Sequence, residues 1–151
     1  MAPKILVVDD EPSIVKLVTA SLSGRGYEIF QAYDGQEAIV QAKLHKPDLI
    51  LLDVMMPRMD GTEARKRLLA DPETKDIPVI HLTAVGDFDK QREALADGAT
   101  DYIVKPFAPS DLAHIVADML DPKKREAMAK ERAHKSAHLR AITDIMHRER
   151  K

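Results

Sequence analysis

Four short apolar segments of this 151-residue chain are each followed directly by polar side chains that can take part in chemistry. Two adjacent carboxylates, Asp9 and Asp10, follow one segment, Asp53 follows another, and Thr83 and Lys105 end the last two. Carboxylate oxygens suit a hard divalent cation such as Mg²⁺. An ammonium group can pair with a carboxylate or with a phosphoryl oxygen, and a hydroxyl can donate a hydrogen bond. Together these residue types indicate phosphoryl chemistry centred on Asp53.

The segments that would position these side chains alternate between two hydrophobic periods. Short apolar runs predict strands, and the near-continuous ones suit strands that are covered on both faces. Amphipathic stretches of about ten to fourteen residues lie between them and predict helices. The five predicted strands are Ile5–Val8, Tyr27–Ala32, Leu49–Leu52, Ile77–Leu82 and Tyr102–Val104.

Several predicted helices carry recognisable start signals. Pro12 is suited to a first helical position, because its missing N–H would have no partner there. Asp34 with Glu37, and Asp60 with Glu63, have the spacing of a capping box in which Asp is the cap. These signals place each helix start shortly after the end of a predicted strand.

Five repeats of strand and helix predict an α/β fold with a five-stranded parallel sheet, doubly wound in the flavodoxin-like order 2-1-3-4-5. An additional helix is expected at the C-terminus, starting at Asp121-Pro122. In a sheet of this kind the functional crevice lies beyond the carboxyl ends of the strands. The acidic pair, Asp53, Thr83 and Lys105 are all expected at that edge.

These residues resemble a known family, the receiver domains of bacterial two-component response regulators, and within it the single-domain, CheY-like members. The resemblance covers about Lys4 to Asp121. Its motifs are specific in combination: the pair Asp9-Asp10, the segment Asp53-Val-Met-Met-Pro-Arg-Met-Asp-Gly61, Leu82-Thr83-Ala84 and Lys105-Pro106-Phe107.

The resemblance implies a role for each site residue. Asp53 would be the phosphoacceptor, Thr83 would bind the phosphoryl group, and Lys105 would pair with it. Thr83 and Tyr102 would form the switch that changes the surface of the fourth helix, fifth strand and fifth helix. The peptide bond before Pro106 is usually cis in this family. The implied Mg²⁺ ligands are Asp9, Asp10, Asp53 and the backbone carbonyl of Met55.

Each of these residues taken alone is also compatible with a purely structural role. The acidic pair can stabilise a helix amino end, Asp53 can be a turn residue, and Lys105 can be a solvated charge. A flavodoxin-type FMN binder would share the strand order, but its phosphate would be repelled by Asp9-Asp10-Glu11. A haloacid-dehalogenase-type phosphatase would need a second acid where this chain has Met55. We therefore expect a signalling protein, not an enzyme, in which the aspartyl phosphate persists.

Charge divides the chain into two parts. Residues 1–121 carry 13 basic and 21 acidic side chains, and residues 122–151 carry 10 and 4. We expect a receiver domain over 1–121 and a basic helical tail over 122–151. The chain has no cysteine, which excludes thiolate chemistry, and no apolar run long enough for a signal or membrane segment. A cytoplasmic location is expected.

The tail has two patterns that suggest pairing with another helix. Leu139, Ile142 and Met146 form an apolar face, and alanines recur every four residues from Ala129 to Ala141. The favoured interpretation is a homodimer through this helix. A solvated extension, and a linker to an output domain outside this chain, stay open. The expected partners are a sensor histidine kinase or phosphotransfer protein and a downstream protein target, with no membrane partner. Nucleic acid is not an expected partner, because acidic residues are interspersed in the tail and aromatic residues are absent from it.

Overall fold

The computed structural model describes residues 2–84, 101–124 and 126. Its centre is a single all-parallel sheet with the strand order β2-β1-β3-β4-β5. This is the predicted order, and the predicted strands differ from the observed ones by two residues or fewer at each end. The five strands are β1 (Lys4–Val8), β2 (Glu28–Ala32), β3 (Leu49–Asp53), β4 (Val79–Ala84) and β5 (Asp101–Lys105).

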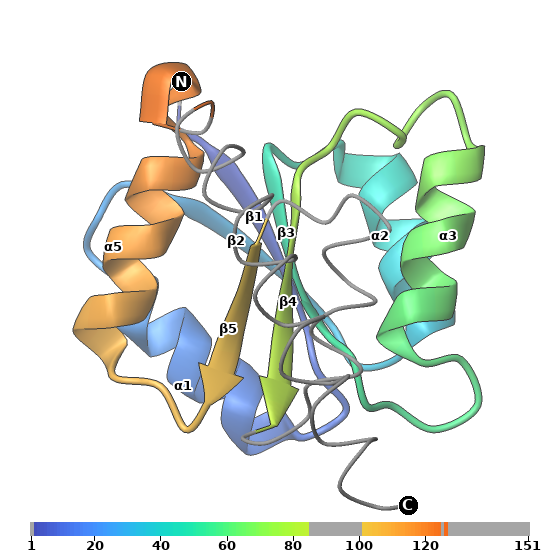
Figure 1. Cartoon of the computed structure of the whole chain (residues 1–151), viewed down its shortest axis with the longest axis horizontal. Coiled ribbons are helices and arrows are strands. Elements are labelled where there is room, and N and C mark those ends of the chain that lie inside the picture. Colours follow the sequence, from blue (N-terminus) through green and yellow to red (C-terminus); the bar gives the residue numbers. More distant parts are fainter. Residues whose placement is uncertain (1, 85–100, 125, 127–151) are drawn as a thin grey trace, which may run out of the picture.

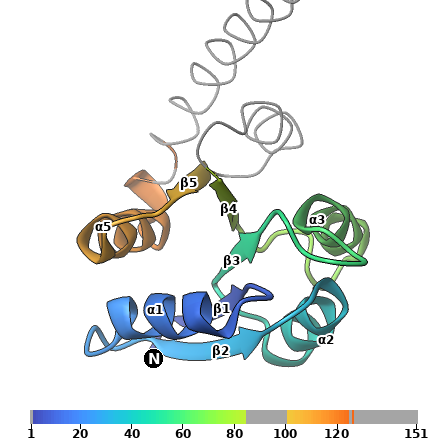
Figure 2. The ribbon, with the colours of Figure 1, turned by 90° about the horizontal axis from the view of Figure 1, so that it is seen from below.

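Helices cover both faces of the sheet, as the near-continuous apolar strands predict. Helices α1 (Pro12–Leu22) and α5 (Pro109–Met119) lie on one face, and α2 (Gly35–His45) and α3 (Gly61–Ala70) on the other (Figures 1 and 2). The helix expected between β4 and β5 would fall in residues 85–100, outside the described residues.

The predicted helix starts are observed. At α2, Oδ1 of Asp34 accepts a hydrogen bond from the N–H of Glu37 at 2.7 Å, and Oε2 of Glu37 accepts one from the N–H of Tyr33 at 3.3 Å. Asp34 is therefore the N-terminal cap of α2, while Glu37 reaches back to the residue before the cap and not to the N–H of Asp34 itself, in a variant of the capping box. At α3, Asp60 accepts from the N–H of Glu63 at 2.9 Å. Capping therefore sets where the helices on this face begin relative to the strands before them.

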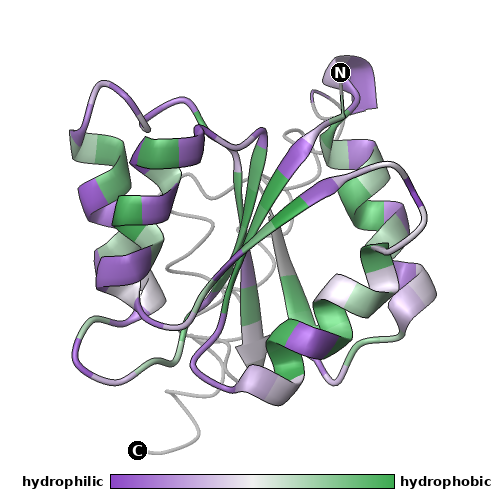
Figure 3. Cartoon of the chain, turned by 180° about the vertical axis from the view of Figure 1, so that it is seen from behind, coloured by the Kyte–Doolittle hydropathy of each residue, from purple (hydrophilic) through white to green (hydrophobic). Residues whose placement is uncertain are grey.

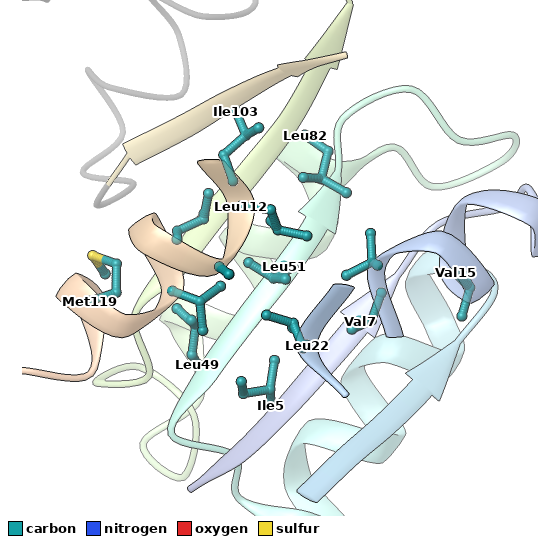
Figure 4. Packing of buried hydrophobic residues seen from close by; sticks show 14 residues of the cluster. Ile5, Val7, Val15, Leu22, Leu49, Leu51, Leu82, Ile103, Leu112 and Met119 are labelled. Atoms are coloured by element: carbon teal, nitrogen blue, oxygen red, sulfur yellow. The ribbon is translucent and has the colours of Figure 1, made fainter. Parts of the chain in front are cut away.

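The core consists of two apolar layers, one on each side of the sheet. Alternate residues of each inner strand serve the two layers, so that Ile5 and Val7 of β1 pack towards α1 and α5, whereas Leu6 and Val8 pack towards α2 and α3. Figure 4 shows the first layer and Figure 3 shows that apolar colouring concentrates on the strands and the inner helix faces. Leu17 of α1 does not join this layer, because it is 41% exposed.

After α5 the chain turns and enters helical conformation again. Oδ1 of Asp121 accepts a hydrogen bond from the N–H of Lys123 at 3.0 Å, and residues 122–124 and 126 are helical. This agrees with the helix start predicted at Asp121-Pro122. The apolar face predicted further along the tail lies outside the described residues. Among the helices that are described, none combines the length and hydropathy that crossing a bilayer requires.

Candidate phosphoacceptor site

The carboxyl ends of the parallel strands meet at one edge of the sheet, towards which the arrowheads of β4 and β5 point in Figure 1. Asp53 is the last residue of β3 and lies in register with Leu82 of β4. Asp9 follows β1 directly, and Lys105 ends β5. Strand topology therefore brings together three side chains that are up to 96 residues apart in the sequence.

Three carboxylates form a cluster at this edge. One carboxylate oxygen from each of Asp9, Asp10 and Asp53 lies within 4.8 Å of those of the other two. Asp9 is fully buried and Asp53 is 3% exposed. Backbone groups orient both buried acids: the N–H of Glu11 donates to Oδ1 of Asp9 at 3.0 Å, and the N–H of Met55 donates to Oδ1 of Asp53 at 3.3 Å.

Lys105 provides the positive charge of the cluster. Its Nζ lies 2.7 Å from Oδ2 of Asp9 and 3.2 Å from Oδ1 of Asp53, so that it bridges the two buried carboxylates. The peptide bond that follows it, to Pro106, is cis, as the resemblance implies. One ammonium group beside three carboxylates leaves an excess of negative charge, which a divalent cation can offset.

The pKa values of the site follow from this arrangement. Burial raises the pKa of Asp53 to about 7, and the nearby charge of Asp9 raises it as well, against the opposing effect of Lys105. Burial alone would lower the pKa of Lys105, but its hydrogen bond to Asp9 and the charge of Asp53 outweigh burial and raise it. Lys105 therefore stays protonated, while ionised Asp53 is held in an unfavourable setting.

The two residues predicted to form the switch lie on neighbouring strands. Thr83 is buried on β4, directly after the residue that pairs with Asp53, and is itself in register with Val104. Tyr102 lies in β5 opposite His81, and its side chain is outside what the structure describes. The backbone thus places Thr83 at the site edge, and its contact with a phosphoryl group stays a prediction.

His81 and Arg65 are buried polar residues for which the sequence predicted no role. His81 is 1% exposed, with Nδ1 3.3 Å from the carbonyl oxygen of Leu52, and Arg65 of α3 is 4% exposed. Burial and, to a smaller extent, the positive charge of Arg65 lower the pKa of His81 to about 4. The burial of Arg65 could have been predicted from its helical spacing with Leu68, because residues three apart lie on the same face of a helix.

The three carboxylates offer only oxygen atoms as metal ligands, and their negative charge exceeds the positive charge of Lys105. Both properties fit Mg²⁺, which prefers carboxylate, carbonyl and water oxygens. Asp9, Asp10 and Asp53 could supply carboxylate oxygens. The N–H of Met55 donates a hydrogen bond to Asp53, so the backbone of Met55 lies next to the acidic cluster. Its carbonyl oxygen stays a predicted Mg²⁺ ligand.

Comparison with known proteins gives the family. Residues 5–117 match the model of the response regulator receiver domain. The chain is 45% identical over 117 residues to the probable transcriptional regulator ycf27 of Cyanophora paradoxa, covering 78% of this chain and 48% of that protein. It is 41% identical over 118 residues to the DNA-binding dual master transcriptional regulator RpaA of Synechocystis sp., covering 78% of this chain and 49% of that protein.

Solved structures agree with this result. The chemotaxis response regulator CheY4 of Vibrio cholerae matches with a TM-score of 0.73 and 37% identity, covering 79% of this chain and 99% of that one. The chain belongs to the response regulator receiver family. It spans about half the length of the curated relatives named above.

Proposed function

We propose that this protein is a phosphorylation-controlled switch in a two-component phosphorelay, with Asp53 as the phosphoacceptor. The observation that carries the proposal is the position of Lys105, whose ammonium group bridges Asp53 and Asp9 inside a cluster of three carboxylates. Asp53 supplies a nucleophilic oxygen, and the ammonium group of Lys105 lies beside it. The neighbouring carboxylates can help to hold a metal ion. Family membership supports the same role.

In the proposed transfer, a carboxylate oxygen of Asp53 attacks the phosphorus of a phosphohistidine on a sensor kinase or phosphotransfer protein. The bond from phosphorus to the histidine nitrogen breaks, and the imidazole keeps the electron pair and takes up a proton. Lys105 pairs with one phosphoryl oxygen, and the hydroxyl group of Thr83 donates a hydrogen bond to another phosphoryl oxygen. The product is an acyl phosphate on Asp53.

Asp9, Asp10, Asp53 and the Met55 carbonyl would hold Mg²⁺, which offsets the negative charge of the incoming phosphoryl group when bound. Asp9 stays oriented for this by the N–H of Glu11. The fold keeps the carboxylates of Asp9, Asp10 and Asp53 close together, because β1 and β3 are paired neighbours in the parallel sheet.

Phosphorylation would then change the partner surface. The acyl phosphate carries nearly two negative charges where the Asp53 carboxylate carried one, and it draws Thr83 towards it. Tyr102 moves into the space beside β4, and the surface of the fourth helix, β5 and α5 changes. This is a shift between two states with different affinities for a downstream protein.

In this proposed function the receiver domain comprises residues 1–121 and acts in the cytoplasm. The tail, residues 122–151, is a second functional segment.

Treatment with acetyl phosphate and Mg²⁺, followed by intact-mass measurement, tests this function. The wild-type protein should gain one phosphoryl group and Asp53→Asn should gain none. Asp76→Asn, in the turn between α3 and β4, is the matched control and should be labelled like the wild type. Chelation of Mg²⁺ should suppress labelling. Labelling of Asp53→Asn at the wild-type rate would show that another residue is the acceptor.

The names of the two curated relatives favour a second candidate, the receiver part of a transcriptional regulator. In that case the tail would connect to an output domain outside this chain. The 151-residue chain alone would then bind duplex DNA only through its net positive tail, with steep salt dependence and no sequence preference. Binding of one DNA sequence over a scrambled one at physiological salt would instead assign DNA recognition to this chain.

A further inference from the structure

Gly61, the first residue of α3, lies against the main chain of the phosphoacceptor. A Cβ atom built on Gly61 would overlap the carbonyl oxygen of Asp53 and would lie 2.9 Å from both the carbonyl carbon of Asp53 and Cα of Val54. Ordinary carbon contacts begin at 3.4 Å. All of these atoms belong to the backbone, so no side-chain rotation can relieve the overlap.

The same stretch of backbone is held from the other side by β4. The N–H of Val54 donates to the carbonyl oxygen of Leu82 at 3.1 Å, and the N–H of Gly61 donates to the carbonyl oxygen of Val54 at 2.8 Å. The peptide between Asp53 and Val54 is therefore fixed between the edge of the sheet and the first turn of α3. This peptide carries the Asp53 side chain at one end and leads to Met55 at the other.

We propose that Gly61 is a positioning residue for phosphoryl transfer. The missing side chain lets α3 close on the Asp53 main chain and so sets the position of the Asp53 carboxylate relative to Lys105 and the acidic pair. This inference rests on the proposed function of Asp53. Gly61 would affect only the position and orientation of the Asp53 carboxylate. Gly61 itself would contact neither the phosphoryl group nor the metal ion.

A methyl group at position 61 forces either α3 or the Asp53 peptide to move. Because a hydrogen bond to Leu82 of β4 holds that peptide, a displacement on the order of 1 Å would be shared between α3 and the acceptor. A misplacement of that size can cost about 100-fold in rate. We expect Gly61→Ala to lower the rate of labelling by acetyl phosphate roughly 10- to 100-fold. The Mg²⁺ concentration that gives half-maximal labelling should rise as well.

Two other glycine variants separate the positioning of Asp53 from the stability of the fold. Gly35→Ala changes the first residue of α2, where the three atoms nearest to the new Cβ all belong to the side chain of Met59, at 2.9–3.0 Å, so a side chain and not the Asp53 main chain has to move. Gly26→Ala adds a Cβ where no atom lies within 4 Å, but at a φ of +81° that is strained for alanine. Both should be labelled at nearly the wild-type rate, and Gly26→Ala should also melt at a lower temperature.

The experiment measures the labelling rate of the folded fraction of the full chain across a Mg²⁺ titration, with the folded fraction taken from circular dichroism. Folded Gly61→Ala with the wild-type rate and Mg²⁺ midpoint would overturn the inference while leaving Asp53 as the acceptor. A wild-type protein that takes up no phosphoryl group would instead overturn the proposed function. If Gly61→Ala is unfolded in buffer, the measurement is repeated in a stabilising osmolyte. Failure to fold there as well would overturn the inference, because Gly61 would then be required for folding itself.

Discussion

Single residues at the site are placed where their charged forms are costly. Asp53 is buried beside Asp9, and Lys105 is the only cation that the described residues place in hydrogen-bonding contact with both. The fold therefore holds the Asp53 carboxyl group where its ionised form is disfavoured, as acceptor sites do when function opposes stability. Removal of that charge should consequently make the fold more stable.

Replacement of Asp53 by Asn should stabilise the metal-free protein. The pKa of Asp53 is raised to about 7, so above that pH the folded protein carries an unfavourable charge that the unfolded chain accommodates in water. Asp53→Asn should raise the free energy of unfolding at pH 8 by on the order of 2 kcal/mol. The gain should shrink as the pH falls from about 7 towards 4, because folded Asp53 then takes up a proton.

Urea denaturation at several pH values, with and without Mg²⁺, measures this effect. Mg²⁺ should narrow the difference between the two proteins, because it offsets the charge of Asp53. Asp76→Asn should change stability by less than about 0.5 kcal/mol at every pH. An Asp53→Asn variant that is less stable than the wild type at pH 8 without metal would contradict the assigned electrostatics.

His81 should make the protein sensitive to acid. Its pKa is lowered to about 4 in the folded state, so between that pH and about 6.5 the unfolded chain binds a proton that the folded protein resists. Stability should therefore be unaffected by His81 above pH 6.5 and decline below it, by at most about 3 kcal/mol in total. His81→Leu should flatten this part of the stability profile, as measured by thermal melting from pH 7 to pH 4. An unchanged slope would show that other groups cause the acid sensitivity.

At the scale of elements, caps and close approaches determine where each helix meets the sheet. The side-chain cap of Asp34 fixes the start of α2, whereas α1 begins after Glu11, whose side chain makes no capping hydrogen bond. Pro12 at the start of α1 provides the alternative signal. Local sequence therefore specifies both helix starts by different means.

The α2 cap gives a quantitative test. Asp34→Ala removes the acceptor for the N–H of Glu37 and should lower the free energy of unfolding by about 1 kcal/mol. Asp34→Asn keeps an oxygen acceptor and should cost only a few tenths of that. Labelling by acetyl phosphate should not change in either variant. A loss from Asp34→Asn equal to that from Asp34→Ala would show that the charge near the helix amino end matters more than the hydrogen bond.

Most elements could be predicted from the sequence because their signals are local. Apolar runs marked the strands, and Asp34, Asp60 and Pro12 marked helix starts. The close approach of Gly61 to Asp53 could not be predicted, because it depends on where α3 packs relative to the end of β3. The burial of His81 and Arg65 depends equally on packing between elements.

At the scale of the whole molecule, the candidate site depends on strand order more than on any local motif. The order β2-β1-β3-β4-β5 places β1 and β3 side by side and so brings Asp9 to Asp53, while β5 supplies Lys105 from a distant part of the chain. The alternation of predicted strands and helices indicated this order, and so predicted that these side chains lie at one edge of the sheet. The family resemblance added the roles of the residues, whereas the individual contacts of Lys105 depend on side-chain packing.

The tail prediction also belongs to this scale. We expect the apolar face at Leu139, Ile142 and Met146 to pair two copies, since an isolated helix of this length is marginal in water. Sedimentation should give a dimer for the full chain with and without beryllofluoride, a mimic of the phosphoryl group. The chain ending at Asp121 should be a monomer that is still labelled by acetyl phosphate. A full chain that remains monomeric at high concentration would exclude pairing.

The central claim is that Asp53 becomes an acyl phosphate, and chemical trapping tests it most directly. Borohydride reduces an acyl phosphate to an alcohol, so the wild-type protein treated with acetyl phosphate and Mg²⁺ and then with borohydride should contain homoserine at position 53. Peptide mass spectrometry locates the converted residue. We expect conversion at Asp53 alone, dependent on Mg²⁺ and absent without acetyl phosphate. Homoserine at Asp9 or Asp10, or no conversion under conditions that convert another receiver domain, would contradict the assignment of Asp53 as the phosphoacceptor.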